Sequence, residues 1–338
     1  MLGSTGRVSP AKCGEEPSEK GRNRLPRILL TGSSGMLGTR LFEKLLDLGF
    51  HTRGIDRKRN RWKTALQART YIADLLKKDS LNMPSEFDMV VHFAANARVY
   101  ELVKTPQLAL ENVLTTFNVL EFARKRDIDR LLFASSREVY GNLPESSPIA
   151  EDRASSRNCE SPYSASKIAG EALFESYGKV YGLGYVILRY SNVYGMYDDS
   201  DRVIPLWVRR ALRNEQLLVY GRDKSLDFTY IDDAVNGTIR AIERFNRVKQ
   251  NVFNIASGKA TRLVELAHEI KRRLRASCGI VIEESRPGEV WKFKADISKA
   301  TQLLRYIPRI TMEAGLDRTL VWYKSFYCTK EVSRRRSC

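Results

Sequence analysis

The sequence predicts an α/β fold, in which a doubly wound parallel sheet carries a smaller C-terminal part. Short apolar runs alternate with segments of helical periodicity from residue 28 to about residue 190. A glycine-rich turn joins the first apolar run to the first helical segment. From Asn192 onward the alternation loosens, and turn-like segments at 220–223 and 285–288 interrupt it. The 338 residues are enough for one large sheet and a second, smaller unit made of interleaved segments.

The first strand, turn and helix carry the strongest signal in the chain. The apolar run 28–30 predicts a buried strand, the turn 31–38 follows it, and leucines recur at helical spacing as far as residue 48. A second predicted strand over 51–56 ends in an acid, Asp56. A strand, a glycine turn and a helix in this order place a pyrophosphate at the helix N-terminus, which predicts a Rossmann-like dinucleotide site.

Each residue type in this motif has a physical task. Gly32 permits the tight turn, Gly35 lets the backbone approach phosphate, and Gly38 lets the helix pack closely on the strand. The carboxylate of Asp56 accepts hydrogen bonds from an adenine ribose and repels a 2′-phosphate, which favours NAD over NADP. Three positively charged residues follow at 57–59. NADP therefore stays the alternative cofactor, because its 2′-phosphate needs positive charges nearby.

The remaining strands and helices of the first part follow in alternation. The expected strands span 70–72, 89–93, 131–134 and 185–188, and the expected helices lie around 107–125 and 163–180. Parallel sheets bind ligands beyond the carboxyl ends of their strands. The polar motifs of this chain fall at those ends, so we expect them to meet in one site.

Tyr163 and Lys167 stand four residues apart, which puts them on one face of a helix. A nearby ammonium and a positive nicotinamide ring both favour a phenolate, so they are expected to lower the pKa of the tyrosine. The phenolate can then take a proton from a substrate hydroxyl while a hydride leaves to NAD. Ser136, at the end of a predicted strand, is expected to hydrogen-bond the same substrate oxygen.

The same spacing occurs twice more, in Tyr100…Lys104 and Tyr220…Lys224. Only Tyr163 follows a glycine turn, a mid-chain acid and a serine-bearing strand end in that order. We therefore expect the other two pairs to be solvated.

Together these motifs resemble those of the NAD-dependent nucleotide-sugar epimerase/dehydratase family, which belongs to the extended short-chain dehydrogenases/reductases. The resemblance covers roughly residues 26 to 325. Its motifs are TGSSGMLG at 31–38, HFAA at 92–95, ENV at 111–113, SSREVYG at 135–141, YSASK at 163–167, RYSNVYG at 189–195 and RPGE at 286–289.

The resemblance implies roles for further residues. The cofactor residues that it implies are Gly32, Gly35, Met36, Leu37, Gly38, Asp56, Asp74, Phe93, Ala94, Ala95, Asn112 and Lys167. The substrate residues that it implies are Ser136, Tyr163, Asn192, Val203, Ile204 and Arg286, the asparagine and the arginine being assigned to a diphosphate. Catalysis is assigned to Ser136, Tyr163 and Lys167, with Glu138 as a further acid or base.

Members of the family oxidise a sugar carbon, usually C4, and differ in the fate of the resulting keto sugar. Epimerases return the hydride to the other face, dehydratases eliminate water after removing the C5 proton, and decarboxylases lose the C6 carboxylate. Glu138 suits a dehydratase or a decarboxylase. Arg137 departs from the dehydratase pattern, because an arginine does not give up its proton at neutral pH, and it is expected to pair with Glu138 or point outward.

Leu226 is a second departure, because relatives commonly carry a phosphate-binding arginine at this position. Arg222 or Lys224 is the candidate substitute. The nucleotide and the sugar therefore stay open, and a UDP-hexose 4-epimerase is the leading hypothesis by family frequency. A 4,6-dehydratase or decarboxylase is the alternative enzyme.

The composition and the net charge limit the classes of ligand and compartment that the sequence supports. The net charge of +17 suits an anionic ligand such as a nucleotide-diphosphate sugar. A non-catalytic NAD- or RNA-binding protein on the same fold is the hypothesis from another class, although the sequence has no nucleic-acid motif. Five scattered cysteines without metal-ligand spacing predict no metal site and a reducing cytoplasmic compartment. No apolar stretch approaches the ~20 residues that span a membrane.

We expect four segments along the chain: a disordered N-terminal extension (1–24), a Rossmann NAD-binding domain (25–191), a mainly substrate-binding part interleaved with it (192–327) and a loose basic tail (328–338). The resemblance also implies a homodimer, formed by the helices around 107–125 and 163–180.

Overall fold

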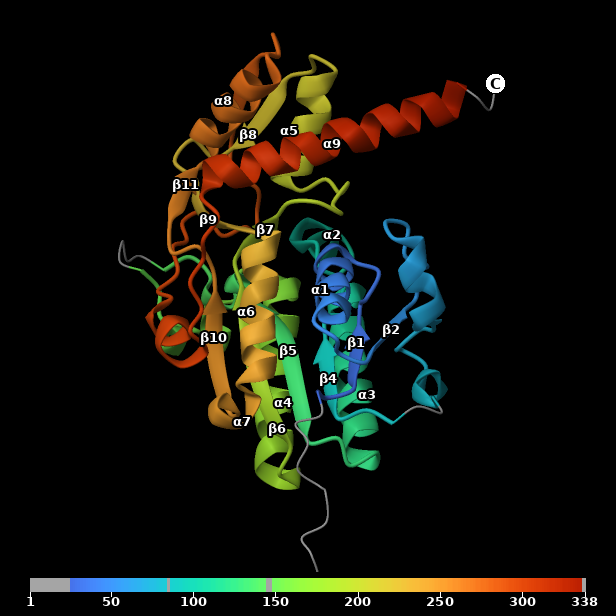
Figure 1. Cartoon of the computed structure of the whole chain (residues 1–338). Coiled ribbons are helices and arrows are strands. Elements are labelled where there is room, and N and C mark those ends of the chain that lie inside the picture. The colour runs from blue at the N-terminus through green and yellow to red at the C-terminus, as the bar shows by residue number, and fades with distance from the viewer. Residues whose placement is uncertain (1–24, 84–85, 144–147, 336–338) are drawn as a thin grey trace, which may run out of the picture.

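The computed structural model describes residues 25–83, 86–143 and 148–335, so the extension expected at 1–24 lies outside the described residues. Its centre is a seven-stranded parallel sheet in the order β10-β6-β5-β4-β1-β2-β3 (Figure 1). The strands are β1 Ile28–Thr31, β2 Thr52–Asp56, β3 Thr70–Ile72, β4 Met89–His92, β5 Arg130–Ser136, β6 Gly184–Tyr190 and β10 Asn251–Ile255. The predicted doubly wound α/β fold is confirmed.

The sheet is covered on both faces, which explains why its strands are continuous apolar runs. Ile28 and Leu30 face one hydrophobic core, and Leu29 between them faces the other. Helices α1 and α6 pack together in the first core, and α3 and α4 pack together in the second. These helices are α1 Met36–Asp47, α3 Gln107–Lys125, α4 Pro162–Tyr181 and α6 Ile231–Glu243.

The smaller part follows β6 and stands over the carboxyl ends of the sheet (Figure 1). Its strands form a three-stranded sheet in the order β11-β9-β7 and a β12-β8 pair. They are β7 Asn192–Tyr194, β8 Leu217–Tyr220, β9 Ser225–Tyr230, β11 Ala260–Arg262 and β12 Ile280–Glu283. The remaining helices are α2 Val99–Lys104, α5 Val203–Leu212, α7 Phe245–Val248, α8 Leu263–Leu274 and α9 Met312–Arg335.

The segment 192–327 also contributes to the main sheet. Strand β10 pairs with β6 at the sheet edge, and α6 packs against α1. The sequence pattern predicted interleaving without locating β10 or α6. The two parts of the fold are thus joined through a shared sheet.

The C-terminal segment differs from the expected loose tail, because helix α9 continues as far as Arg335. Figure 1 shows this helix crossing the top of the molecule and running on toward the C-terminus. Trp322 and Phe326 stack on each other with ring centroids 5.0 Å apart, and both pack against Trp62, at 5.6 and 5.3 Å. The expectation rested on the charge of the tail and overlooked that the segment 316–335 contains no proline or glycine.

No helix in the described ranges is long and apolar enough to cross a membrane. The same residues contain no group of three or more His, Cys, Asp or Glu side chains placed to hold a metal ion.

Candidate active site

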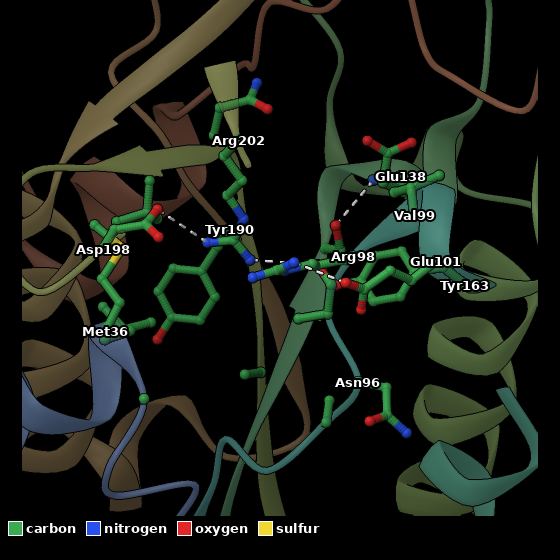
Figure 2. A pocket seen from close by; sticks show the side chains of 18 of the residues that line it. Met36, Asn96, Arg98, Val99, Glu101, Glu138, Tyr163, Tyr190, Asp198 and Arg202 are labelled. Atoms are coloured by element: carbon green, nitrogen blue, oxygen red, sulfur yellow. Dashed lines mark hydrogen bonds and ion pairs between the residues drawn. The ribbon is translucent and has the colours of Figure 1, made fainter. Parts of the chain in front are cut away.

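A cavity of about 640 Å³ opens between the carboxyl ends of the sheet strands and the smaller part. Its size falls in the range of small-molecule sites, which is roughly 300–1,000 Å³. Every candidate site residue proposed from the sequence lines it, from Gly32 at one end to Arg286 at the other. Figure 2 shows Met36 and Tyr163 on different sides of this cavity.

The glycine turn has no room for side chains. Gly32 has a φ of +67°, and a Cβ there would lie 2.7 Å from the backbone nitrogen of Ala94. A Cβ on Gly38 would lie 2.1 Å from the carbonyl oxygen of Gly32. The N-cap of α1 is Gly35, which offers no side chain to the first amides of the helix. These amides and the helix dipole therefore remain available for a pyrophosphate.

We expect Gly38→Ala to abolish NAD binding, because the added methyl group collides with backbone that cannot move cheaply. The measurement is the NAD content of the purified protein, together with its affinity for added NAD. Gly279→Ala is the matched control, since a Cβ there makes only an ordinary contact of 3.8 Å with Gln216. Normal NAD content in Gly38→Ala would contradict the assignment of this turn.

Asp56 ends β2 beside the turn. Its two carboxylate oxygens accept hydrogen bonds from the backbone amides of Ser34 at 3.0 Å and Lys58 at 2.9 Å. These bonds hold the carboxylate at the cavity wall with lone pairs left for a ribose. The neighbouring guanidinium of Arg57 donates to Asn96 at 3.0 Å, while Asp74 lines the same end of the cavity.

The segment after β4 forms the opposite wall of the dinucleotide end. The amides of Phe93 and Ala94 both donate to the hydroxyl of Thr31 at 3.1 Å, and Ala95 follows on the cavity wall. Asn112 is buried and bonds the backbone of Asn96 at both ends of its amide group, at 2.7 and 3.0 Å. Asn112 therefore holds the segment after β4 in place through these two hydrogen bonds.

Helix α4 positions Tyr163 and Lys167. It begins with Pro162 at its first position and with a capping box, in which Ser161 and Ser164 satisfy each other's backbone amides. The cap fixes the first turn, where Tyr163 lies. The ammonium of Lys167 stands 5.8 Å from the centre of the Tyr163 ring and donates to the carbonyl oxygen of Ala134 at 2.8 Å.

Ser136 ends β5 next to this helix. Its hydroxyl accepts the amide of Glu138 at 3.3 Å, and its side chain also hydrogen-bonds Tyr163. The structure therefore brings Ser136, Tyr163 and Lys167 together at the end of one strand, as the sequence pattern predicted.

The predicted lowering of the Tyr163 pKa includes the charge of a bound nicotinamide ring and stays a prediction. Burial raises the pKa of this phenol above its ordinary value, and the hydrogen bond from Ser136 is the first of the opposing effects. Burial also lowers the pKa of Lys167 to about 8. The sequence pattern shows the spacing of the two groups, but it does not show that both are withdrawn from water.

Arg137 and Glu138 form an ion pair of 2.7 Å, and each side chain is buried. This pairing is one of the two expected arrangements of Arg137. Burial raises the pKa of Glu138, and the charge of Arg137 opposes that effect. One oxygen of Glu138 and one nitrogen of Arg137 have no hydrogen-bond partner within the described chain.

The other substrate residues proposed from the sequence, besides Ser136 and Tyr163, lie on the smaller part. Asn192 donates from its amide to the carbonyl oxygen of Asp227 at 2.9 Å, and Val203 and Ile204 begin helix α5. The guanidinium of Arg286 stands 3.7 Å above the ring of Tyr220. All of these residues except Asp227 line the cavity.

Sequence reasoning missed several charged residues of the cavity. Arg98 and Arg202, which directly precede α2 and α5, also line it and have no motif to mark them (Figure 2). Lys224, which the sequence offered with Arg222 as a substitute for the missing arginine, lines the cavity and pairs with Glu289 at 2.5 Å. Arg222 is not one of the described lining residues. Lys224 is buried, so the expectation of a solvated Tyr220…Lys224 pair is wrong, because segment 289–293 covers β9.

Comparison with known proteins gives a consistent result. The chain matches the NAD dependent epimerase/dehydratase family over residues 28–256. A putative UDP-glucose 4-epimerase from Methanocaldococcus jannaschii is 33% identical over 309 residues, which cover 88% of this chain and 98% of that protein. A UDP-N-acetyl-alpha-D-glucosaminuronate decarboxylase from Bacillus cytotoxicus is 30% identical over 322 residues, with coverages of 88% and 98%.

Among solved structures, the UDP-glucuronic acid 4-epimerase from Bacillus cereus, in complex with UDP-glucuronic acid and NAD, has a TM-score of 0.83 to this fold. It is 29% identical, and the match covers 89% of this chain and 100% of that one.

The family match spans the whole glycine turn, the end of β5 and the start of α4, all of which line the cavity. The predicted cofactor, NAD, is confirmed by this match and fits the glycine cradle beside Asp56. The chain is an enzyme and belongs to the NAD-dependent epimerase/dehydratase family.

Proposed function

We propose that the protein is a UDP-hexose 4-epimerase, which inverts C4 of the sugar through a transient keto intermediate. The observation that carries the proposal is the meeting of Ser136, Tyr163 and Lys167 in the same cavity as the glycine turn. This group can remove a proton from a sugar hydroxyl next to a bound dinucleotide.

Each side chain of this group has its own task. Tyr163 takes the proton of the C4 hydroxyl, and Ser136 holds that oxygen through its own hydroxyl. Lys167 keeps an ammonium beside the phenol and favours its ionised form. NAD held at the glycine turn beside Asp56 would supply the hydride acceptor next to C4, and its positive nicotinamide ring would further favour the phenolate.

The diphosphate of the substrate is assigned to Asn192 and Arg286. Arg286 presents a planar fork suited to phosphate oxygens, and the ring of Tyr220 below it holds the fork in place. Val203 and Ile204 supply apolar contacts from the start of α5. Epimerisation also requires the keto sugar to present its other face, and the open cavity leaves space for this.

Arg137 favours the epimerase over the alternative lyases. A dehydratase needs an acid that protonates the leaving hydroxyl, and Arg137 stays protonated. Glu138 is held at 2.7 Å by that arginine. The carboxylate is therefore assigned to positioning, and its role as a base is the alternative.

The test is incubation of the purified protein with UDP-, dTDP-, GDP- and CDP-sugars in heavy water, followed by NMR and mass spectrometry. We expect a UDP-hexose with inverted C4, unchanged composition and no deuterium. Loss of water or carbon dioxide with uptake of deuterium would overturn the proposal and make Glu138 a working acid or base.

A homodimer through α3 and α4 is part of the proposal. Three apolar residues on α3 are exposed: Leu110 by 62%, Leu114 by 44% and Phe117 by 38%. They border a shallow hollow that also includes Leu173 of α4. Burying such a stripe against a second copy would remove apolar surface from water.

The dimer is tested by the double substitution Leu110→Glu and Phe117→Glu, with light scattering as the measurement. We expect the mass to fall from that of two chains to that of one. Val321→Glu on α9, where the residue is 69% exposed, is the control and should leave the mass unchanged. A monomeric wild-type protein would overturn the dimer.

The compartment that we propose is the cytoplasm. Cys159 and Cys278 are free thiols among the described residues, which suits a reducing environment. Nucleic acid is not proposed as a partner, since a basic composition alone is weak support for one.

A further inference from the structure

A buried chain of hydrogen bonds begins at the glycine turn and passes through His92. The hydroxyl of Thr31, the last residue of β1, is 2.8 Å from Nδ1 of His92, which ends β4. Nε2 of His92 is 3.2 Å from the hydroxyl of Thr116 on α3. All three side chains are buried, so these bonds are made away from water.

The chain continues from α3 to Tyr163. The hydroxyl of Thr116 donates to the carbonyl oxygen of Asn112 at 2.8 Å, and the side-chain amide of Asn112 donates to the hydroxyl of Ser166 at 3.1 Å. The Ser166 hydroxyl in turn donates to the carbonyl oxygen of Tyr163 at 2.7 Å. The glycine turn and the catalytic tyrosine are therefore connected through four elements, β1, β4, α3 and α4.

The donors and acceptors of this chain fix the tautomer of His92. The hydroxyl of Thr31 accepts the amides of Phe93 and Ala94, each at 3.1 Å, which occupies both of its lone pairs. Thr31 consequently donates its own proton to Nδ1 of His92. The ring proton then lies on Nε2 and is donated to Thr116. His92 is thus the neutral Nε2–H tautomer, and the bonds of the chain point in one direction, which strengthens them cooperatively.

The surroundings of His92 keep its ring neutral. Burial lowers the pKa of His92 to about 3, and the positive charge of Lys167 adds to this effect. The His92 ring stacks on Phe133 with centroids 5.8 Å apart, and the ammonium of Lys167 stands 5.0 Å from the centre of the Phe133 ring. A second proton on His92 would place a like charge near Lys167 and would leave the hydroxyl of Thr31 without its acceptor.

We propose that His92 is a positioning residue, which holds the cavity wall 93–95 at a fixed distance from Tyr163 for the hydride step. On one side it holds Thr31, to which the wall amides are bonded, and on the other side it holds α3, which is bonded to α4. A misplacement of about 1 Å between reacting groups can cost about 100-fold in rate. The inference rests on the hydride step of the proposed function, which the alternative lyases share.

Thr116→Val tests the chain, because valine has the shape of threonine without the hydroxyl. We expect kcat to fall by about 10- to 100-fold, while the KM for the nucleotide sugar and the NAD content change little. The isotope effect on kcat, measured with a sugar carrying deuterium on C4, should rise because the hydride step becomes more rate-limiting. Thr116→Ser keeps the hydroxyl and should recover most of the rate.

Thr319→Val is the matched control. Thr319 is a buried threonine on α9, and its hydroxyl also donates to the carbonyl oxygen four residues earlier, that of Gly315, at 2.6 Å. The control should leave kcat and the isotope effect unchanged. A smaller active fraction of Thr116→Val with an unchanged isotope effect would show a structural role only and overturn the inference. Unchanged kcat in Thr116→Val would overturn it as well.

Nitrogen NMR of the histidine rings tests the tautomer without any turnover. The chain has three histidines, and His92→Phe identifies the signals of His92 by removing them. In the NAD-saturated protein at neutral pH we expect a proton on Nε2 and none on Nδ1. A proton on Nδ1 would contradict the direction of the chain and overturn the inference.

Failure of the proposed function would leave a different pattern. Loss of water or carbon dioxide from the sugar, with an isotope effect that rises in Thr116→Val, would reject the epimerase and sustain the positioning role. C4 inversion with the same kcat and isotope effect in Thr116→Val as in the unaltered protein would sustain the epimerase and reject the positioning role.

Discussion

Tyr163→Phe is expected to reduce kcat by about 10²- to 10⁴-fold while NAD stays bound, as for the loss of a general base. Ser136 bonds the phenol, and Lys167 lies 5.8 Å from its ring, so the oxygen removed is the one at the reacting position. The ring itself remains, which preserves the cavity wall and the packing of α4. Rates on the nucleotide sugar and the NAD content of the purified variant are the measurements.

Tyr181→Phe is the control, because this tyrosine lies at the exposed end of the same helix. It should leave both rate and NAD content unchanged. Full activity in Tyr163→Phe would remove this residue from the chemistry. Tight, salt-sensitive RNA binding that Tyr163→Phe leaves unaffected, in a protein without turnover, would instead favour a non-catalytic role.

Arg189→Met is expected to lower the free energy of unfolding by about 3–5 kcal/mol, the usual cost of breaking a buried ion pair. Arg189 and Glu171 are both buried and joined by two hydrogen bonds, at 2.9 and 2.6 Å. The guanidinium also donates to Tyr140 at 3.1 Å and to the carbonyl oxygen of Glu151 at 2.6 Å. The substitution leaves a carboxylate and two acceptors buried without this donor.

Urea unfolding of the NAD-saturated protein measures this effect. Arg124→Met is the control, since its pair with Glu121 lies at the partly exposed surface and should contribute less to stability. The double substitution Arg189→Met and Glu171→Leu should recover part of the loss, because it removes the unpaired charge. A loss below that of the control would show that the buried pair contributes nothing.

Local patterns were enough to predict six of the seven strands of the main sheet. The glycine turn and the strands through β6 carry their own signals in apolar runs and turn residues. Strand β10 was missed because five residues, two of them asparagine, resemble many edge segments, and only pairing with β6 identifies them. Apolar patterning within one short strand does not identify that strand when its pairing partner is distant in sequence.

The active site shows the same difference between what local sequence predicts and what the whole fold determines. The spacing of Tyr163 and Lys167 places them on one helix face, but their pKa values depend on burial by the whole fold. Arg202 donates to the carbonyl oxygen of Ala97, 105 residues away in the sequence, and this contact is a product of tertiary structure. The sequence therefore predicted the residues that carry the chemistry, but it did not predict which charged side chains surround them.

The contact of Trp62 with Trp322 and Phe326 has a consequence for biosynthesis. Trp62 belongs to the loop after Asp56, and its aromatic partners lie on α9, near the end of the chain. During synthesis the dinucleotide half leaves the ribosome long before those partners exist. Contacts of such high sequence separation form late in folding. The loop after Asp56 therefore gains this packing only after α9 has been synthesised.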